Sequence, residues 1–198
     1  MTSSTDPTHH LFWLSSRAFG VVALVLVSLS VSFGLALAGG VARRPGLPKR
    51  LKNVHESLAL AGLIAIALHG LLLLGDSYLK PGLVGITVPF TLSVNPVWNG
   101  LGVIAGWMSA VIVGSFYVRR RIGVKLWRWL HRWTFAVYGL AVVHTLGSGT
   151  DAGSVWLLAI MALPAVPIVT LGAARALGIS VPWTTTPSPS RSSIPTAR

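Results

Sequence analysis

Long apolar runs alternate with short polar or charged segments along most of the chain. Each run holds roughly 18 or more residues, which is the length an α-helix needs to cross a hydrocarbon core of about 30 Å. The runs occupy residues 18–38, 54–75, 100–118, 129–146 and 154–174. The pattern therefore predicts an all-α integral membrane protein, built as a bundle of five transmembrane helices.

The first run ends in Ala36-Leu37-Ala38, which resembles a signal-peptidase site. The run is longer than the apolar core of a typical signal peptide, and both Asp6 and a single Arg17 precede it. We therefore expect this segment to stay in the protein as its first span.

The composition agrees with a membrane location. Hydrophobic residues make up 53% of the chain and charged residues only 10%, which is outside the usual range of soluble domains. We therefore expect a multi-pass protein of the cell membrane, in contact with lipid.

Positive charge is concentrated in two short loops between the spans, and this sets the expected topology. The net charge is +12, but its position argues against a nucleic-acid partner. The loop cations are Arg43, Arg44, Lys49, Arg50 and Lys52 in one loop, and Arg119, Arg120, Arg121, Lys125, Arg128 and Arg132 in the other. Cationic loops stay on the cytoplasmic side, so we expect the amino terminus outside and the carboxyl terminus inside.

The domain organisation follows from the same pattern. Residues 1–12 form a polar amino-terminal segment, 13–175 the membrane domain, and 176–198 a tail rich in Pro, Ser and Thr that we expect to be disordered and cytoplasmic. No Gly-rich dinucleotide fingerprint stands between a strand and a helix, so we expect no nicotinamide-binding domain in this chain.

Cysteine is absent, which limits the metal chemistry. Iron–sulfur clusters, thiolate-ligated or covalently attached haem, and zinc–thiolate sites are excluded. Any metal centre must use histidine or oxygen ligands.

Four histidines lie inside the predicted spans, where polar side chains are rare and usually functional. His55 and His69 are 14 residues apart on the second span, and His131 and His144 are 13 apart on the fourth. These two spans run in the same direction, so His55 is level with His131 and His69 with His144. Two imidazoles at one depth match the axial ligands of a haem iron, and 14 residues place two such sites about 21 Å apart.

The angular positions of these histidines make a further prediction. Fourteen residues at about 100° each return to nearly the same helix face, whereas 13 residues miss it by about 140°. The fourth span must therefore bend, rotate locally or approach its two sites from different sides, and Gly139 is a candidate position for such a bend.

Basic residues near the histidines are candidate partners of haem propionates. Lys52 precedes His55 by three residues, Arg128 precedes His131 by three, and Arg17 opens the first span. All three also fit the alternative of ordinary anchoring at the membrane surface.

Several segments together resemble the ferric-reductase-like transmembrane family, which includes the haem subunit of methionine sulfoxide reductase systems and the haem domains of NADPH oxidases. The similarity covers residues 13–175 and rests on Ser16-Arg17-Ala18-Phe19-Gly20, the His55/His69 pair, Leu68-His69-Gly70, Trp129-Leu130-His131-Arg132 and His144.

The resemblance implies two b haems stacked across the bundle, the inner one held by His55 and His131 and the outer one by His69 and His144. It also implies electron flow outward, to ferric ions, oxygen or an extracytoplasmic reductase, with Arg17 near the outer haem. We expect no flavin and NADPH module like that of the oxidases in this chain, which departs from the family there. We therefore expect a separate flavoprotein or membrane quinol as the electron donor, and the cationic inner loops suit an acidic partner.

Three other interpretations stay open at this point. The histidines can act as hydrogen-bonding groups between helices. A quinol-oxidising cytochrome b uses similar histidine pairs, although the Pro-Glu-Trp-Tyr segment typical of its quinol site is missing. A histidine-lined metal or proton transporter without haem is the third, but such pathways usually include carboxylates within the membrane.

Overall fold

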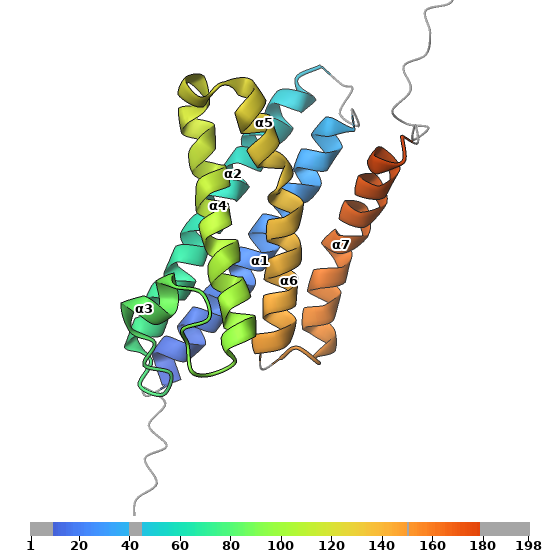
Figure 1. Ribbon diagram of the computed structural model, residues 1–198. Coiled ribbons are helices and arrows are strands. Elements are labelled where there is room, and N and C mark those ends of the chain that lie inside the picture. The colour runs from blue at the N-terminus through green and yellow to red at the C-terminus, as the bar shows by residue number, and fades with distance from the viewer. Residues whose placement is uncertain (1–9, 40–44, 150, 179–198) are drawn as a thin grey trace, which may run out of the picture.

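The computed structural model describes residues 10–39, 45–149 and 151–178, and within these ranges the regular structure is helical (Figure 1). Residues 1–9, Arg43 and Arg44, and the tail from 179 onward lie outside the described residues. The helices are α1 Leu11–Ala38, α2 Leu47–Leu72, the short 3-10 helix η2 Leu73–Gly75, α3 Gly82–Thr87, α4 Pro96–Ile122, α5 Val124–Arg132, α6 Thr134–Ser148 and α7 Val155–Ala176.

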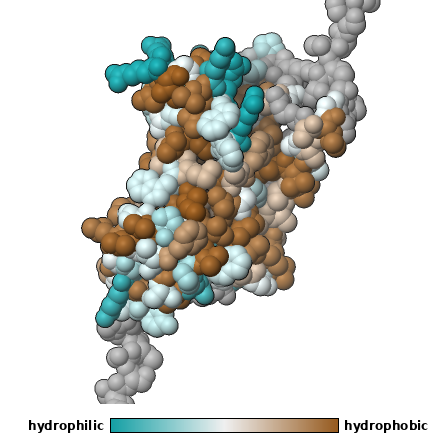
Figure 2. Space-filling model, in the orientation of Figure 1, coloured by the Kyte–Doolittle hydropathy of each residue, from teal (hydrophilic) through white to brown (hydrophobic). Residues whose placement is uncertain are grey.

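Four of the predicted spans are confirmed as helices long and apolar enough to cross a membrane: Leu11–Ala38, Leu47–Gly75, Pro96–Ile122 and Val155–Ala174. Apolar side chains cover the outside of these helices. Ile64, Leu71, Val111, Val166 and Val169 are each more than half exposed. Figure 2 shows hydrophobic side chains over the middle of one face, with hydrophilic ones gathered near its upper end. The chain is therefore a multi-pass membrane protein whose outer surface contacts lipid.

The fourth predicted span is not one long helix. It is divided into α5, which ends at Arg132, and α6, which begins at Thr134 and has only 15 residues. The two helices follow one another along α4 (Figure 1). The break lies at Trp133, whose N–H donates to the carbonyl of Leu130, while the Thr134 hydroxyl donates to the carbonyl of His131. The predicted departure from a regular helix is thus confirmed, but it falls six residues before Gly139.

Proline and residues with positive φ mark the starts of two helices. Asn95, with φ of 46°, precedes Pro96 at the first position of α4, where the missing proline N–H breaks no helical hydrogen bond. Gly123, with φ of 84°, separates α4 from α5 in a conformation that only glycine adopts readily. Asn95 and Pro96 thus fix the start of α4, and Gly123 fixes where its cationic end turns into α5.

The α1 helix lies at the centre of the packing. It packs against α2 on one side and against α7 and α6 on another. The Tyr138 hydroxyl donates to the carbonyl of Met161 at 3.2 Å, which ties α6 to α7 inside this core. The buried cluster that joins the helices consists of Leu24, Val31, Leu35, Tyr138, Leu157, Met161 and Ile168.

The apolar segment 81–96 folds against α4. The Trp107 indole N–H donates to the carbonyl of Thr87 at 2.8 Å, and Phe90 packs against Gly100. This contact accounts for a tryptophan that lies away from both ends of its helix, where indole rings are otherwise enriched.

The packing of α7 can be tested with two adjacent leucines. Leu157 is 2% exposed within the core, whereas Leu158 is 44% exposed on the lipid side. We expect Leu157→Ala to lower the melting temperature of the purified protein in detergent clearly, since burying a leucine is worth about 2 to 5 kcal/mol over an alanine. Leu158→Ala should leave it nearly unchanged. Equal effects of both variants would contradict the packing of α7 on α1.

Candidate functional site

The four histidines of the predicted spans form two pairs, as their spacing predicts. His55 on α2 faces His131 on α5 with ring centroids 5.9 Å apart and ring planes at 83°. His69 on α2 faces His144 on α6 at 6.2 Å and 69°. The 14 residues between His55 and His69 separate the two pairs by about 21 Å along α2.

The distance within each pair suits two ligands of one metal ion. An imidazole nitrogen binds a metal ion at about 2 Å, so two imidazoles on opposite sides of one ion have ring centroids about 6 Å apart. Because α5 and α6 are separate helices, His131 and His144 can both face α2 despite their 13-residue spacing. The break at Trp133 is therefore what allows both pairs to form.

At the His69–His144 pair, named the outer pair after the topology expected from the sequence, α1 holds the His69 ring by its Nδ1 atom. The Nδ1–H donates to the carbonyl oxygen of Ser16 at 2.7 Å, and the Ser16 hydroxyl donates to the carbonyl oxygen of His69 at 2.8 Å. Ser16 is only 1% exposed. With Nδ1 protonated by this bond, the unprotonated nitrogen of His69 is Nε2.

The His55–His131 pair, named the inner pair in the same way, repeats this arrangement 14 residues along α1. The His55 Nδ1–H donates to the carbonyl oxygen of Ser30 at 2.8 Å, and the Ser30 hydroxyl donates to the carbonyl oxygen of His55 at 3.1 Å. The two serines are spaced like the two histidines they serve, because α1 and α2 run antiparallel with the same residues per turn. In both pairs the α2 histidine therefore presents Nε2 as its unprotonated nitrogen, the atom that could bind a metal ion.

The partner histidines are held differently from one another. The Nδ1–H of His144 donates to the carbonyl oxygen of Trp98 on α4 at 2.9 Å. The His131 ring instead stacks on Trp127, one turn earlier on α5, with centroids 5.4 Å apart and planes at 28°. Within the described residues, the His131 ring forms no hydrogen bond.

A cavity of about 590 Å³ opens beside the inner pair, within the range of small-molecule and cofactor pockets. Both His55 and His131 line it. Its walls are mainly apolar, formed by residues that include Val27, Val31, Leu63, Ile66, Ile112, Val113 and Val137.

Polar and charged side chains also line this cavity, toward the cationic ends of α2 and α4. Lys52 forms an ion pair with Glu56 at 3.6 Å, and Arg119 lies over the Phe116 ring at 3.9 Å. The Trp127 indole nitrogen is buried without a hydrogen-bond partner. The cavity thus combines an apolar body with hydrogen-bond donors and positive charge.

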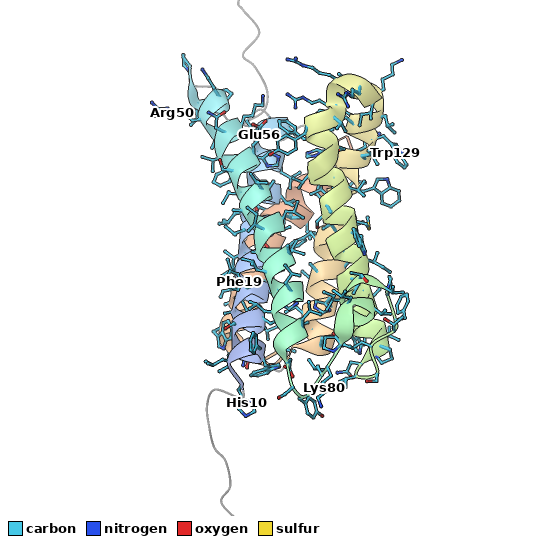
Figure 3. All side chains as sticks on the ribbon, turned by 90° about the vertical axis from the view of Figure 1, so that its left-hand side faces the viewer. His10, Phe19, Arg50, Glu56, Lys80 and Trp129 are labelled. Atoms are coloured by element: carbon cyan, nitrogen blue, oxygen red, sulfur yellow. The ribbon has the colours of Figure 1, made fainter. Side chains whose placement is uncertain are left out.

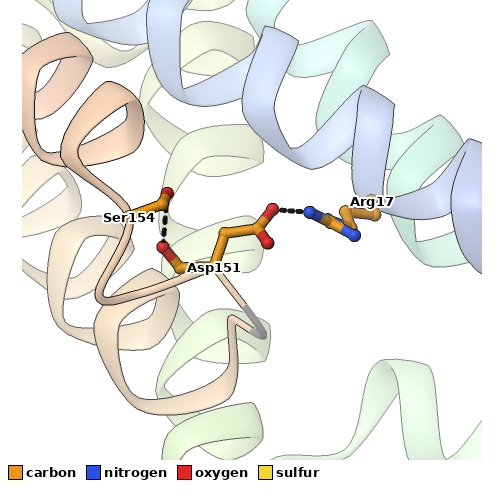
Figure 4. Close-up of polar contacts among 3 residues, drawn as sticks. All are labelled: Arg17, Asp151 and Ser154. Carbon is orange, nitrogen blue, oxygen red and sulfur yellow. Dashed lines mark hydrogen bonds and ion pairs between the residues drawn. The ribbon is translucent and has the colours of Figure 1, made fainter.

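The three predicted basic residues lie in different surroundings. Lys52 lines the inner cavity, whereas Arg128 is not among its lining residues. Arg17 forms an ion pair with Asp151, whose carbonyl accepts a hydrogen bond from the Ser154 hydroxyl at 2.8 Å (Figure 4). The Arg17 guanidinium also lies 5.3 Å from the centroid of the Trp13 ring. Arg17 therefore joins the start of α1 to the segment between α6 and α7.

Charge and position divide the bundle into two ends. Figure 3 shows Arg50, Glu56 and Trp129 near one end and His10 and Lys80 at the other. The inner histidine pair lies toward the end that carries Arg50, and the outer pair toward the end that carries Lys80.

Comparison with known families decides what kind of domain this is. The family model described as the ferric reductase like transmembrane component matches residues 19–142, which is more than half of the chain. The chain belongs to the ferric-reductase-like family. Neither a curated protein nor a solved structure matches it.

Membership of the ferric-reductase-like family gives the protein a role in membrane electron transfer, and domains of this family generally bind haem. The matched segment contains His55, His69 and His131, while His144 and Arg17 lie just beyond its ends. The geometry of the His69–His144 pair thus adds His144, which lies outside the matched residues.

Several residues of this ferric-reductase-like site had no role assigned to them from the sequence. Ser16 and Ser30 carried a usable signal, since their 14-residue spacing repeats that of His55 and His69. Arg119 and Trp127 carried no such signal, because the sequence does not distinguish them from the other cations and tryptophans of the same segment. Only the packing of the helices does. Their place in the inner cavity depends on the turn at Gly123.

Proposed function

We propose that the protein is a membrane di-haem b cytochrome that passes electrons across the membrane to an acceptor on the outer side. The observation that carries this proposal is the pair of level-matched histidine sites, each with ring centroids about 6 Å apart, spaced along one helix. Family membership supports it independently.

The donor set fits haem better than a bare metal ion. Each site offers two imidazoles, whereas a structural or catalytic zinc takes three or four protein ligands. Within the part of the chain that the structure describes, no three His, Cys, Asp or Glu side chains gather at one point. A haem iron needs only two axial ligands, because the porphyrin supplies the other four.

The residues that would hold each haem follow from the geometry. His55 and His131 would bind the inner haem iron, and His69 and His144 the outer one. The apolar walls of the inner cavity suit a macrocycle. Its buried Trp127 N–H, with Lys52 and Arg119 beside it, suits the propionate groups.

If both histidines of a pair held one haem, no position would be left for a substrate at the iron, and the haem would supply one-electron transfer. The protein's part is to hold the imidazoles, exclude water and provide fixed dipoles around them. The carbonyls of Ser16, Ser30 and Trp98 provide such dipoles at Nδ1. We therefore infer that the protein is an electron-transferring oxidoreductase subunit, and not an enzyme that binds its substrate at the iron.

The proposed orientation of the chain in the membrane rests on the charge distribution. The cationic segments lie at the end of the inner pair, which the positive-inside rule assigns to the cytoplasm. On this proposal Lys80 and the Arg17–Asp151 ion pair, which lie toward the other end of the bundle, are outside, and so is the amino terminus. On this proposal α5 and α6 together make the fourth of five crossings, between α4 and α7, and the carboxyl terminus lies inside.

The electron donor has to reach the inner pair from the cytoplasmic side or from within the membrane. Exposed cations at that end, among them Lys49, Arg50 and Lys125, would attract the acidic face of a separate flavoprotein. A membrane quinol is the alternative donor. The acceptor on the outer side would be ferric ion, oxygen or an extracytoplasmic reductase.

Haem content of histidine variants tests the proposal. Purified wild-type protein should contain two haem b per chain and show a reduced-minus-oxidised b-type spectrum. We expect His69→Ala to lose the outer haem and His131→Ala the inner one, because each variant leaves an iron with one axial ligand. His10→Ala, exposed and outside both pairs, is the matched control and should keep both haems.

Folded wild-type protein without haem absorbance would overturn the proposal and favour a histidine-lined transporter. Retention of two normal haems in His69→Ala would show that the assigned ligands are wrong.

The orientation can be tested with single cysteines, since the natural chain has none. Tyr78→Cys lies in the segment between α2 and α3 with the native side chain 84% exposed, and Lys125→Cys lies at the cationic end. We expect a membrane-impermeant maleimide to label Tyr78→Cys in intact cells and Lys125→Cys only after lysis. The opposite labelling pattern would reverse the proposed topology.

A further inference from the structure

Three of the four histidine rings meet the same backbone pattern on a neighbouring helix. The carbonyl that accepts the Nδ1–H belongs to Ser16, Ser30 or Trp98. In each case the residue four positions later, one helical turn on, is a glycine: Gly20, Gly34 and Gly102 respectively. The repeat occurs on two different helices, α1 and α4.

These glycines lie directly against the imidazole rings. A Cβ atom at Gly20 would stand 3.0 Å from Nδ1 of His69, and one at Gly34 would stand 3.2 Å from Cε1 of His55. At Gly102 it would stand 2.6 Å from Nδ1 of His144. All three distances are shorter than ordinary carbon contacts of about 3.5 to 4.0 Å, so any side chain would push the ring away.

We propose that Gly20, Gly34 and Gly102 are positioning residues, which keep each ring against the helix that binds its Nδ1–H and so direct Nε2 toward the facing histidine. This inference rests on the proposed haem function. The glycines touch the ligand histidines and act through them.

The mechanism has two parts. A missing Cβ lets the ring approach the helix closely enough to donate its Nδ1–H to the carbonyl one turn earlier. That hydrogen bond fixes the tautomer and the ring orientation, and it makes Nε2 a more basic ligand, which tunes a bound metal. A methyl group at the glycine position would lengthen or break the bond and rotate the ring.

The two sites differ in how many such contacts they have. At the outer pair both rings are held, His69 by Gly20 and His144 by Gly102. At the inner pair only His55 is held in this way, while His131 stacks on Trp127. Substitutions at the glycines should therefore affect the two haems selectively, and Gly102→Ala most severely because its space is the tightest.

The experiment compares Gly20→Ala and Gly102→Ala with Gly34→Ala in the full chain. The readouts are haem per chain, the midpoint potential of each haem by potentiometric titration, and the electron paramagnetic resonance signal of each ferric haem. The His69→Ala and His131→Ala variants identify which signal belongs to which site. We expect Gly20→Ala and Gly102→Ala to shift the potential and the signal of the outer haem, or to lose that haem, with the inner haem unchanged. Gly34→Ala should do the reverse.

Gly70→Ala and Gly114→Ala are the matched controls. Gly70 directly follows His69, and Gly114 lies on α4 like Gly102, but a Cβ atom at either position meets nothing within 4 Å. Both controls should keep the two wild-type potentials and signals. In Gly20→Ala, Gly34→Ala and Gly102→Ala, the haem at the other site serves as an internal check that the protein is folded.

Wild-type protein with two haems, combined with glycine variants that match the controls at both sites, would overturn this inference and leave the proposed function intact. Loss of both haems in Gly20→Ala or Gly102→Ala would overturn it too, because it would show a general packing role. Wild-type protein without haem would instead overturn the proposed function itself.

Discussion

The arrangement of this protein depends on how an imidazole satisfies its N–H inside a membrane. No water is present in the hydrocarbon core, so an imidazole N–H there is stabilised by a protein acceptor, and three of the four rings have one. Helix carbonyls are normally occupied by the bond from four residues later, but a carbonyl oxygen has a second lone pair. Ser16, Ser30 and Trp98 offer that second lone pair, and a glycine one turn on gives the ring room to reach it. The α1 helix thereby orients the α2 histidines that the ligand sites require.

A second hydrogen bond, from the serine hydroxyl back to the histidine carbonyl, strengthens the contact between α1 and α2. In each case the serine on α1 accepts from the imidazole through its backbone and donates to the histidine carbonyl through its hydroxyl. Bonds of this kind between membrane helices are individually modest, about 0.6 to 2 kcal/mol, but here each one also fixes a ring direction. Their 14-residue repeat gives two similar sites along the antiparallel α1 and α2 helices.

The division of the fourth span solves a geometric problem that a regular helix cannot. His131 and His144 are 13 residues apart, which on one straight helix would send them to different faces. Ending α5 at Arg132 and starting α6 at Thr134 changes the direction of the chain between them. Both histidines then face α2. His131 lies on a short helix and stacks on Trp127, so the two histidine pairs are alike on the α2 side and different on the other.

The long helices and the histidine pairing could be predicted from the sequence, because the length of apolar runs and the spacing of polar residues within them are strong signals in membrane proteins. The apolar runs predicted four of the long helices, and the equal depth of His55 with His131 and of His69 with His144 predicted the pairing. The position of the break did not follow, since Gly139 is the more flexible residue in that span, whereas the interruption depends on the backbone at Trp133. The role of α1 did not follow either, because a serine in a span bonds most often to its own helix, as Ser28 and Ser109 do here.

The most direct test of the central claim is the electron paramagnetic resonance spectrum of the oxidised wild-type protein. Two bis-histidine sites with ring planes at 83° and 69° should give two strongly anisotropic low-spin ferric haem signals, because ring planes far from parallel leave the iron d orbitals nearly degenerate. A predominant high-spin ferric signal would contradict bis-histidine ligation. The absence of any haem signal from folded protein would contradict the account as a whole.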